Sequence, residues 1–140
     1  MQQHAYIKLV PSSKQQSITT DEVKQLFYYY KDITSKTGTQ LGWEYEQSAF
    51  PYSLEEKREG KERWFYLKGT DKQKYKYIMV GLDSEVTEGT NTSYIQVTLP
   101  EGFTHGDKGK ANEFCKFMAK QLDGELHLFN GRVMYYYKRK

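Results

Sequence analysis

The sequence predicts an α+β fold: a two-layer sandwich with two main helices packed on one face of a mostly antiparallel sheet. Short stretches of alternating apolar and polar residues, typical of strands, recur along the chain. Two longer stretches instead show the spacing of an amphipathic helix. Most of the strand-like stretches are joined by polar turns, which favour antiparallel neighbours. The length of 140 residues fits a single domain spanning residues 1–140.

The first helix has the clearest local signals. Thr19 and Glu22 have the spacing of a capping box, in which each side chain accepts a hydrogen bond from the other residue's backbone. Apolar residues then recur at helical spacing over residues 23–33, and Gly38 is placed to end the helix in a left-handed conformation. A second helix is expected over residues 108–123.

Strands are expected over residues 5–10, 63–68, 75–82, 92–99, 125–129 and 132–137. The last two flank Asn130-Gly131, the preferred pair for a two-residue type I′ turn, which would place Leu126 opposite Tyr135. The polar residues 83–91 are expected as a loop.

Residues 40–62 are the hardest to assign and are expected as an excursion or a short helical insertion. Ser53 and Glu56 repeat the capping-box spacing, which favours a short helix over residues 54–59.

Strand alternation predicts a sheet with two unlike faces, because residues two apart share a face. One set is aliphatic and would be covered by the helices, whereas the other is rich in tyrosine and tryptophan. The candidate binding residues on this aromatic face are Trp64, Tyr66, Tyr75, Tyr77, Tyr94 and Tyr136. Three other interpretations stay open: residues 40–62 cover the face, the sheet curls and buries it, or the tyrosines are simply good strand residues with solvated hydroxyls.

The charge distribution leaves a nucleic-acid partner open as an alternative. Residues 1–99 hold 13 basic and 13 acidic side chains, whereas residues 100–140 hold 8 and 5, so the net charge of +3 arises from the C-terminal part. Aromatic rings with basic neighbours can stack on the bases of a single strand. An excess this small is more often a solubility feature.

Nothing in the sequence has the pattern of a catalytic, metal or cofactor site, so we expect no enzyme activity, no metal and no cofactor. One weaker candidate is the loop 104–110, where Lys108 and Lys110 with His105 nearby could hold an anion or nucleotide at a helix N-terminus. A turn capped by Asp107 is the simpler interpretation.

Cellular location is predicted from what the chain lacks. Cys115 is the only cysteine and cannot form an internal disulfide. There is no signal-like N-terminus and no run of about 18 apolar residues that could span a bilayer. We therefore expect a cytoplasmic protein without a membrane partner.

Three stretches resemble an uncharacterised family of small proteins from Bacillus-type bacteria: residues 5–11 (AYIKLVP), 19–24 (TTDEVK) and 75–99. The family is catalogued only as a domain of unknown function. The resemblance implies a two-layer sandwich, with a topology similar to the TATA-binding-protein half-repeat. It implies no activity and no site residues, and such a topology would not by itself imply DNA binding.

Taken together, the residues favour a non-enzymatic binding or self-associating module. It would use the aromatic face to form a homodimer or to bind another protein.

Overall fold

The computed structural model describes residues 2–41, 50–55, 64–71 and 73–138, with residues 35–41 and 87 described by their backbone alone. The elements in chain order are β1 (Gln3–Lys8), α1 (Thr20–Leu41), β2 (Tyr52–Glu55), β3 (Trp64–Gly69), β4 (Tyr77–Thr87), β5 (Thr90–Leu99), α3 (His105–Leu122), β6 (Glu125–His127) and β7 (Val133–Tyr135).

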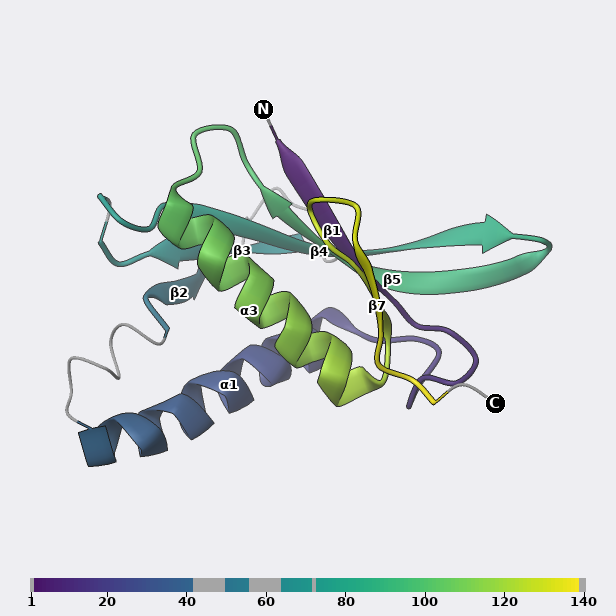
Figure 1. Cartoon of the computed structure of the whole chain (residues 1–140), viewed down its shortest axis with the longest axis horizontal. Helices are drawn as coiled ribbons and strands as arrows, with labels where there is room; N and C mark the ends of the chain where they lie inside the picture. The colour runs from purple at the N-terminus through teal and green to yellow at the C-terminus, as the bar shows by residue number, and fades with distance from the viewer. Residues whose placement is uncertain (1, 42–49, 56–63, 72, 139–140) are drawn as a thin grey trace.

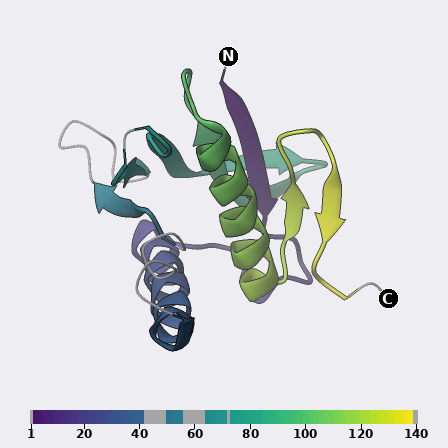
Figure 2. The same cartoon turned by 60° about the vertical axis from the view of Figure 1, so that its left-hand side comes forward.

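The described strands form one seven-stranded sheet in the order β2-β3-β4-β5-β1-β6-β7. Every neighbouring pair is antiparallel. Both described helices lie on the same side of this sheet, as Figures 1 and 2 show from two directions. The predicted α+β two-layer architecture is therefore confirmed, whereas a TATA-binding-protein-like topology is not.

The core lies between the helices and the aliphatic face of the sheet. Its largest fully buried side chains are Phe27, Phe114, Ile7, Leu67, Ile78, Ile95, Leu99, Met118, Leu126, Val23, Val80 and Val97. Phe27 of α1 and Phe114 of α3 pack edge to face with ring centroids 5.4 Å apart, and Phe27 also meets Phe65 of β3. These aromatic contacts join the two helices to each other and to the sheet.

Helix α1 begins as predicted. The Glu22 backbone N–H donates to Oγ1 of Thr19 at 3.1 Å, and the Thr19 N–H donates to the Glu22 carboxylate at 3.0 Å. The helix does not end at Gly38 but continues to Leu41. A glycine inside a helix costs only about 1 kcal/mol relative to alanine, so it lowers stability without stopping the helix.

Helix α3 begins three residues earlier than predicted, at His105. Thr104 is its N-cap, and Asp107 at the third helical position completes a capping box with it. The Gly-Asp-Lys-Gly-Lys stretch is thus the first part of the helix and not a loop. The capping box supplies the bonding partners that a helix start requires.

Residues 52–55 form the edge strand β2, so Leu54 and Glu55 do not begin the helix predicted over 54–59, and positions 56–59 lie outside the described residues. Antiparallel pairing of Tyr52 with Gly69 and Leu54 with Leu67 fixes its alternation, with Tyr52 buried and Ser53 exposed. Pairing with β3 outweighs the local capping signal at Ser53, whose partner position 56 lies outside the described residues.

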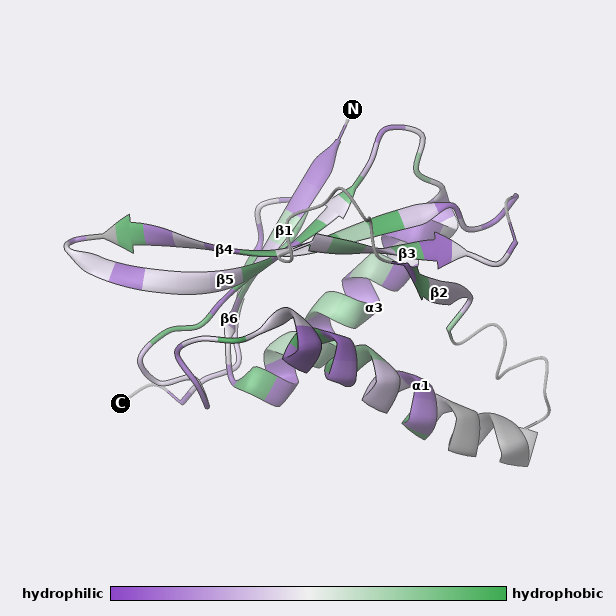
Figure 3. Ribbon diagram, turned by 180° about the vertical axis from the view of Figure 1, so that it is seen from behind, coloured by the Kyte–Doolittle hydropathy of each residue, from purple (hydrophilic) through white to green (hydrophobic). Residues whose placement is uncertain are grey.

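Residues 83–91, expected as a loop, instead extend strands β4 and β5 into a long hairpin arm, defined here as residues 83–93. Its turn, Glu88-Gly89, has positive φ at both positions (52° and 79°), as a type I′ turn requires. Figure 1 shows the arm reaching well beyond the rest of the sheet, and Figure 3 shows it mostly in pale colours of intermediate hydropathy, with purple patches and a green patch near the tip. Val86 near its tip is 73% exposed.

The final hairpin differs from the prediction by one residue in register. Leu126 pairs with Met134, not Tyr135. The Leu128 N–H donates to the Arg132 carbonyl, and the Gly131 N–H donates to the Leu128 carbonyl, leaving a three-residue loop. Only Gly131 in this loop has positive φ (86°), so the turn is a type I turn followed by a left-handed glycine.

Candidate functional site: the open sheet face

The side of the sheet opposite the helices is called here the open sheet face. The register and the alternation of the strands assign its side chains. These are His4, Tyr6, Lys8, Ser53, Glu55, Trp64, Tyr66, Lys68, Tyr77, Met79, Asp83, Glu85, Thr92, Tyr94, Gln96, Thr98, Glu125, His127, Val133 and Tyr135. All except Thr98 are partly or fully exposed, whereas their strand neighbours on the other face are mostly buried.

Aromatic rings on this face form two pairs, one bridging strands β3 and β4 and the other bridging β5 and β1. Tyr66 and Tyr77 pack with centroids 5.7 Å apart, and Tyr6 and Tyr94 pack edge to face at 5.5 Å. Tyr77 is 43% exposed. Paired rings lose little conformational freedom when a partner binds, which suits a contact surface.

Four of the six predicted aromatic residues, Trp64, Tyr66, Tyr77 and Tyr94, lie on the open sheet face as expected. Tyr75 does not, because strand β4 begins only at Tyr77. The Tyr75 ring instead packs on Tyr52 at 5.5 Å, next to the core.

Tyr136 is the second predicted residue that lies elsewhere. A one-residue shift in register moves every side chain of a strand to the opposite face. Met134 and Tyr136 therefore pack against the core, while Val133 and Tyr135 take their places on the open sheet face. The backbone N–H of Tyr136 donates to the Gly124 carbonyl, and burial raises the pKa of its phenol.

A polar cluster that sequence reasoning did not single out lies at the centre of the face. Nδ1 of His4 is 2.9 Å from Oγ1 of Thr98 and 3.1 Å from Nε2 of Gln96. Strand alternation placed Gln96 and Thr98 on this face, but His4 lay outside the predicted first strand. The cluster fixes three polar side chains next to the Tyr6–Tyr94 pair.

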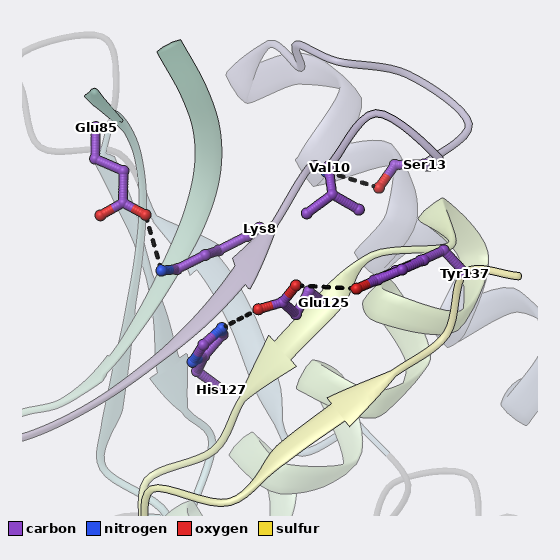
Figure 4. Close-up of polar contacts among 7 residues, drawn as sticks. All are labelled: Lys8, Val10, Ser13, Glu85, Glu125, His127 and Tyr137. Atoms are coloured by element: carbon purple, nitrogen blue, oxygen red, sulfur yellow. Dashed lines mark hydrogen bonds and ion pairs between the residues drawn. The ribbon is translucent and has the colours of Figure 1, made fainter. Parts of the chain in front are cut away.

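Carboxylates and their partners line one end of the face, as Figure 4 shows. Lys8 Nζ lies 2.8 Å from the Glu85 carboxylate. Glu125 is 2.8 Å from Nε2 of His127 through one oxygen and accepts a hydrogen bond from the Tyr137 hydroxyl through the other. Glu85 was missed as a face residue because its stretch resembles a polar loop.

The acidic side chains give the described face a net negative charge. Its described members include two lysines, Lys8 and Lys68, and four carboxylates, Glu55, Asp83, Glu85 and Glu125. With neutral histidines the face therefore has a net charge of −2, opposite in sign to the +3 of the whole chain. Burial raises the pKa of Tyr94, and the carboxylates of Asp83 and Glu85 raise it further.

The candidate anion loop is occupied by the protein's own carboxylate. Asp107 is fully buried and accepts hydrogen bonds from the Tyr52 hydroxyl and from the backbone N–H groups of Lys76 and Thr104. Lys110 is 3.0 Å from Glu113, and His105 is exposed. Lys108, the residue after Asp107, is half-buried and makes none of the bonds named here.

Cys115 of helix α3 is buried in the core, and burial raises the pKa of its thiol to about 12. Among the residues that the structure describes, no three His, Cys, Asp or Glu side chains gather as a metal site would require. Neither of the described helices has a stretch long and apolar enough to cross a membrane.

The segment 40–62 falls partly outside the described residues, which exclude 42–49 and 56–63. In its described part, Phe50 and Tyr52 lie in the core against Phe114, at 5.6 and 5.9 Å between ring centroids. Residues 50–52 therefore pack on the helix side of the sheet and not on the open sheet face.

The fold and the site define a two-layer α+β protein with one covered and one open sheet face. The chain belongs to a family described as a domain of unknown function (DUF1885), whose profile matches residues 3–138. It is also similar to the crystal structure of a protein of unknown function from Bacillus stearothermophilus. The two share 44% sequence identity over 87% of this chain and 91% of that one, with a TM-score of 0.55. A comparison with curated proteins finds no match.

Proposed function

We propose that this protein is a non-enzymatic binding module that uses the open sheet face to contact another polypeptide or a second copy of itself. The observation that carries the proposal is the row of partly exposed rings, Trp64, Tyr66, Tyr77 and Tyr94, on the side of the sheet away from both described helices. Tyrosine and tryptophan are the side chains that most often anchor protein interfaces.

Two features of the face suit a contact surface. The rings are held by packing against each other, and the polar cluster of His4, Gln96 and Thr98 is held by hydrogen bonds. A partner therefore meets groups already in position, so less ordering entropy opposes binding.

The two alternatives have weaker support. A single-stranded nucleic acid would meet a face whose described charges sum to −2, and phosphate binding depends on basic side chains. An anion at the α3 N-terminus would have to compete with the buried carboxylate of Asp107.

The test compares the wild type with a Tyr66→Ser/Tyr77→Ser double variant. Sedimentation velocity over a range of concentrations measures self-association, and affinity capture from an extract of the producing cells measures binding to other proteins. The proposal expects one of these interactions to be present in the wild type and lost in the variant.

A Tyr28→Ser/Tyr29→Ser variant is the control, because both tyrosines are about half exposed (48% and 49%) but lie on helix α1. Circular dichroism of all three proteins verifies folding. A strictly monomeric wild type whose captured proteins are identical to those of the double variant would overturn the proposal.

A further inference from the structure

The indole of Trp64 lies flat over Gly81 in the middle of the open sheet face. The two residues are register partners on β3 and β4. A Cβ atom at position 81 would lie 2.2, 2.3 and 2.4 Å from Cδ2, Cε3 and Cε2 of Trp64. Three nearly equal distances to these bonded atoms place the glycine beneath the plane of the ring. The other surface of the indole is therefore turned away from the sheet.

Carboxylates follow Gly81, and the Trp64 indole that covers it, along strand β4. Asp83 is two residues beyond Gly81 on the same face, which corresponds to about 7 Å along a strand. Glu85 is a further two residues along. The Asp83 side chain is exposed, and Tyr94 lies opposite it on β5. An aromatic surface and a carboxylate thus lie at a spacing that one long cationic side chain can bridge.

The net charge of the face indicates the charge that its partner should carry. The described side chains of the open sheet face carry a net charge of −2, although the net charge of the whole chain is +3. The described face is therefore acidic in a basic protein. Two copies placed face to face would bring like charges together, whereas a basic segment would be attracted.

We propose that the open sheet face binds a basic polypeptide segment, with an arginine side chain stacked on Trp64 and its guanidinium directed to Asp83. This inference rests on the proposed function and names the partner's chemistry. Arginine fits better than lysine because its planar guanidinium stacks on aromatic rings and pairs with a carboxylate through two hydrogen bonds.

The partner is a segment and not a free amino acid because the contact surface is wide. The ring pair Tyr66–Tyr77 bridges β3 and β4, and the pair Tyr6–Tyr94 bridges β1 and β5, so together the rings extend from β3 to β1. Three strand spacings separate β3 from β1, which is about 14 Å. An extended segment of several residues can cover that distance.

The experiment measures fluorescence anisotropy of labelled peptides in which serine alternates with arginine, lysine or glutamate. The arginine peptide is expected to bind at least about fivefold more tightly than the lysine peptide. Binding should weaken as salt is added, and the glutamate peptide should not bind.

Two variants test the Trp64 indole and the Asp83 carboxylate separately. Asp83→Asn removes the charge, and Gly81→Ala displaces the indole without removing it, so neither depends on deleting a large side chain. Each is expected to weaken arginine-peptide binding at least about fivefold. Asp21→Asn, a matched change in the first turn of α1, should have no effect. Tryptophan fluorescence of Gly81→Ala reports whether the ring has moved.

Equal binding of the arginine and lysine peptides with no effect of Gly81→Ala would overturn the role of Trp64. Two results would overturn the choice of a basic partner. One is that a single-stranded oligonucleotide binds and that Asp83→Asn strengthens its binding. The other is a face-to-face dimer that excludes the arginine peptide. If no peptide binds while the Tyr66→Ser/Tyr77→Ser variant still loses a captured partner, this inference fails and the proposed function stands.

Discussion

The Tyr52 hydroxyl donates a hydrogen bond to Oδ1 of Asp107 at 2.5 Å, which joins the edge strand β2 to the first turn of helix α3. The same carboxylate accepts from the Lys76 N–H at 3.0 Å and from the Thr104 N–H at 3.0 Å. One buried carboxylate thus ties together β2, the connection between β3 and β4, and the start of α3. A buried charge is tolerated only with such a set of partners.

Removing the Tyr52 hydroxyl should destabilise the fold. Tyr52→Phe deletes one donor to a buried carboxylate, and we expect the free energy of unfolding to fall by about 1–3 kcal/mol in urea denaturation. Asp107→Asn should cost at least as much, because it also weakens the capping box. The double variant should cost less than the sum of the two, and strict additivity would show that the two groups do not interact.

Alkaline pH should destabilise the folded state through Tyr52. Burial, and then the hydrogen bond to Asp107, raise the pKa of the folded phenol far above the ordinary value of 10.0. Above pH 10 the unfolded chain therefore binds fewer protons than the folded chain, so the free energy of unfolding falls as pH rises. One such group contributes about 1.4 kcal/mol per pH unit.

The measurement is a series of urea titrations above pH 9. Tyr52→Phe should make the fall with pH less steep, whereas Tyr28→Phe, a change on the exposed surface of α1, should leave it unchanged. The explanation would be wrong if the wild type and Tyr52→Phe lost stability in parallel.

Cys115 should be inert in the folded protein. Complete burial raises the pKa of its thiol to about 12, and the thiolate is the reactive form. Ellman's reagent is expected to modify it only at the rate at which the protein opens, and fully in denaturant. Rapid reaction under native conditions would show that the core around α3 opens readily.

Gly131 should be required for the final hairpin. Its φ of 86° is strained for any side chain, so Gly131→Ala is expected to lower the free energy of unfolding by about 1 kcal/mol. Gly109→Ala is the control with the opposite sign. It lies in helix α3 with open space at its Cβ position, so alanine should stabilise the protein by about 0.5–1 kcal/mol. Thermal denaturation of both variants decides the matter.

The tip of the β4–β5 arm should be dispensable for folding. Replacing residues 86–91 by Asn-Gly keeps the Glu85–Thr92 pair and the Lys8–Glu85 ion pair. We expect the free energy of unfolding to change by less than about 0.5 kcal/mol, because the removed residues are remote from the core. A larger loss in urea denaturation would mean that the arm supports the sheet.

Strand alternation predicted the two unlike sheet faces because it is a local property of the sequence. The capping box at Thr19 and Glu22 was predictable for the same reason. The register of the last hairpin was not, because it depends on whether Asn130 takes positive φ, which the Asn-Gly pair permits but does not require. That one choice moved Tyr136 from the expected face to the core.

Other features of the site depend on contacts between distant residues. Residues 52–55 become a strand only by pairing with β3, and Asp107 meets Tyr52 across 55 positions of sequence. The arm was misread because its serine, threonine, asparagine and glutamate residues are also typical of loops. As a result, Asp83 and Glu85, which give the open sheet face its charge, were not placed on it.

The β4–β5 arm also creates a risk of aggregation that the buried core does not. From Ser84 to Thr92 its two strands pair with each other and with neither β1 nor β3. Their outer edges therefore present backbone groups that a strand of another molecule could join, the geometry by which sheets grow into aggregates. Apart from Val86, the sequence there is polar and acidic, which discourages such growth. The polar and acidic side chains of the arm thus act against edge-to-edge pairing between copies of this chain.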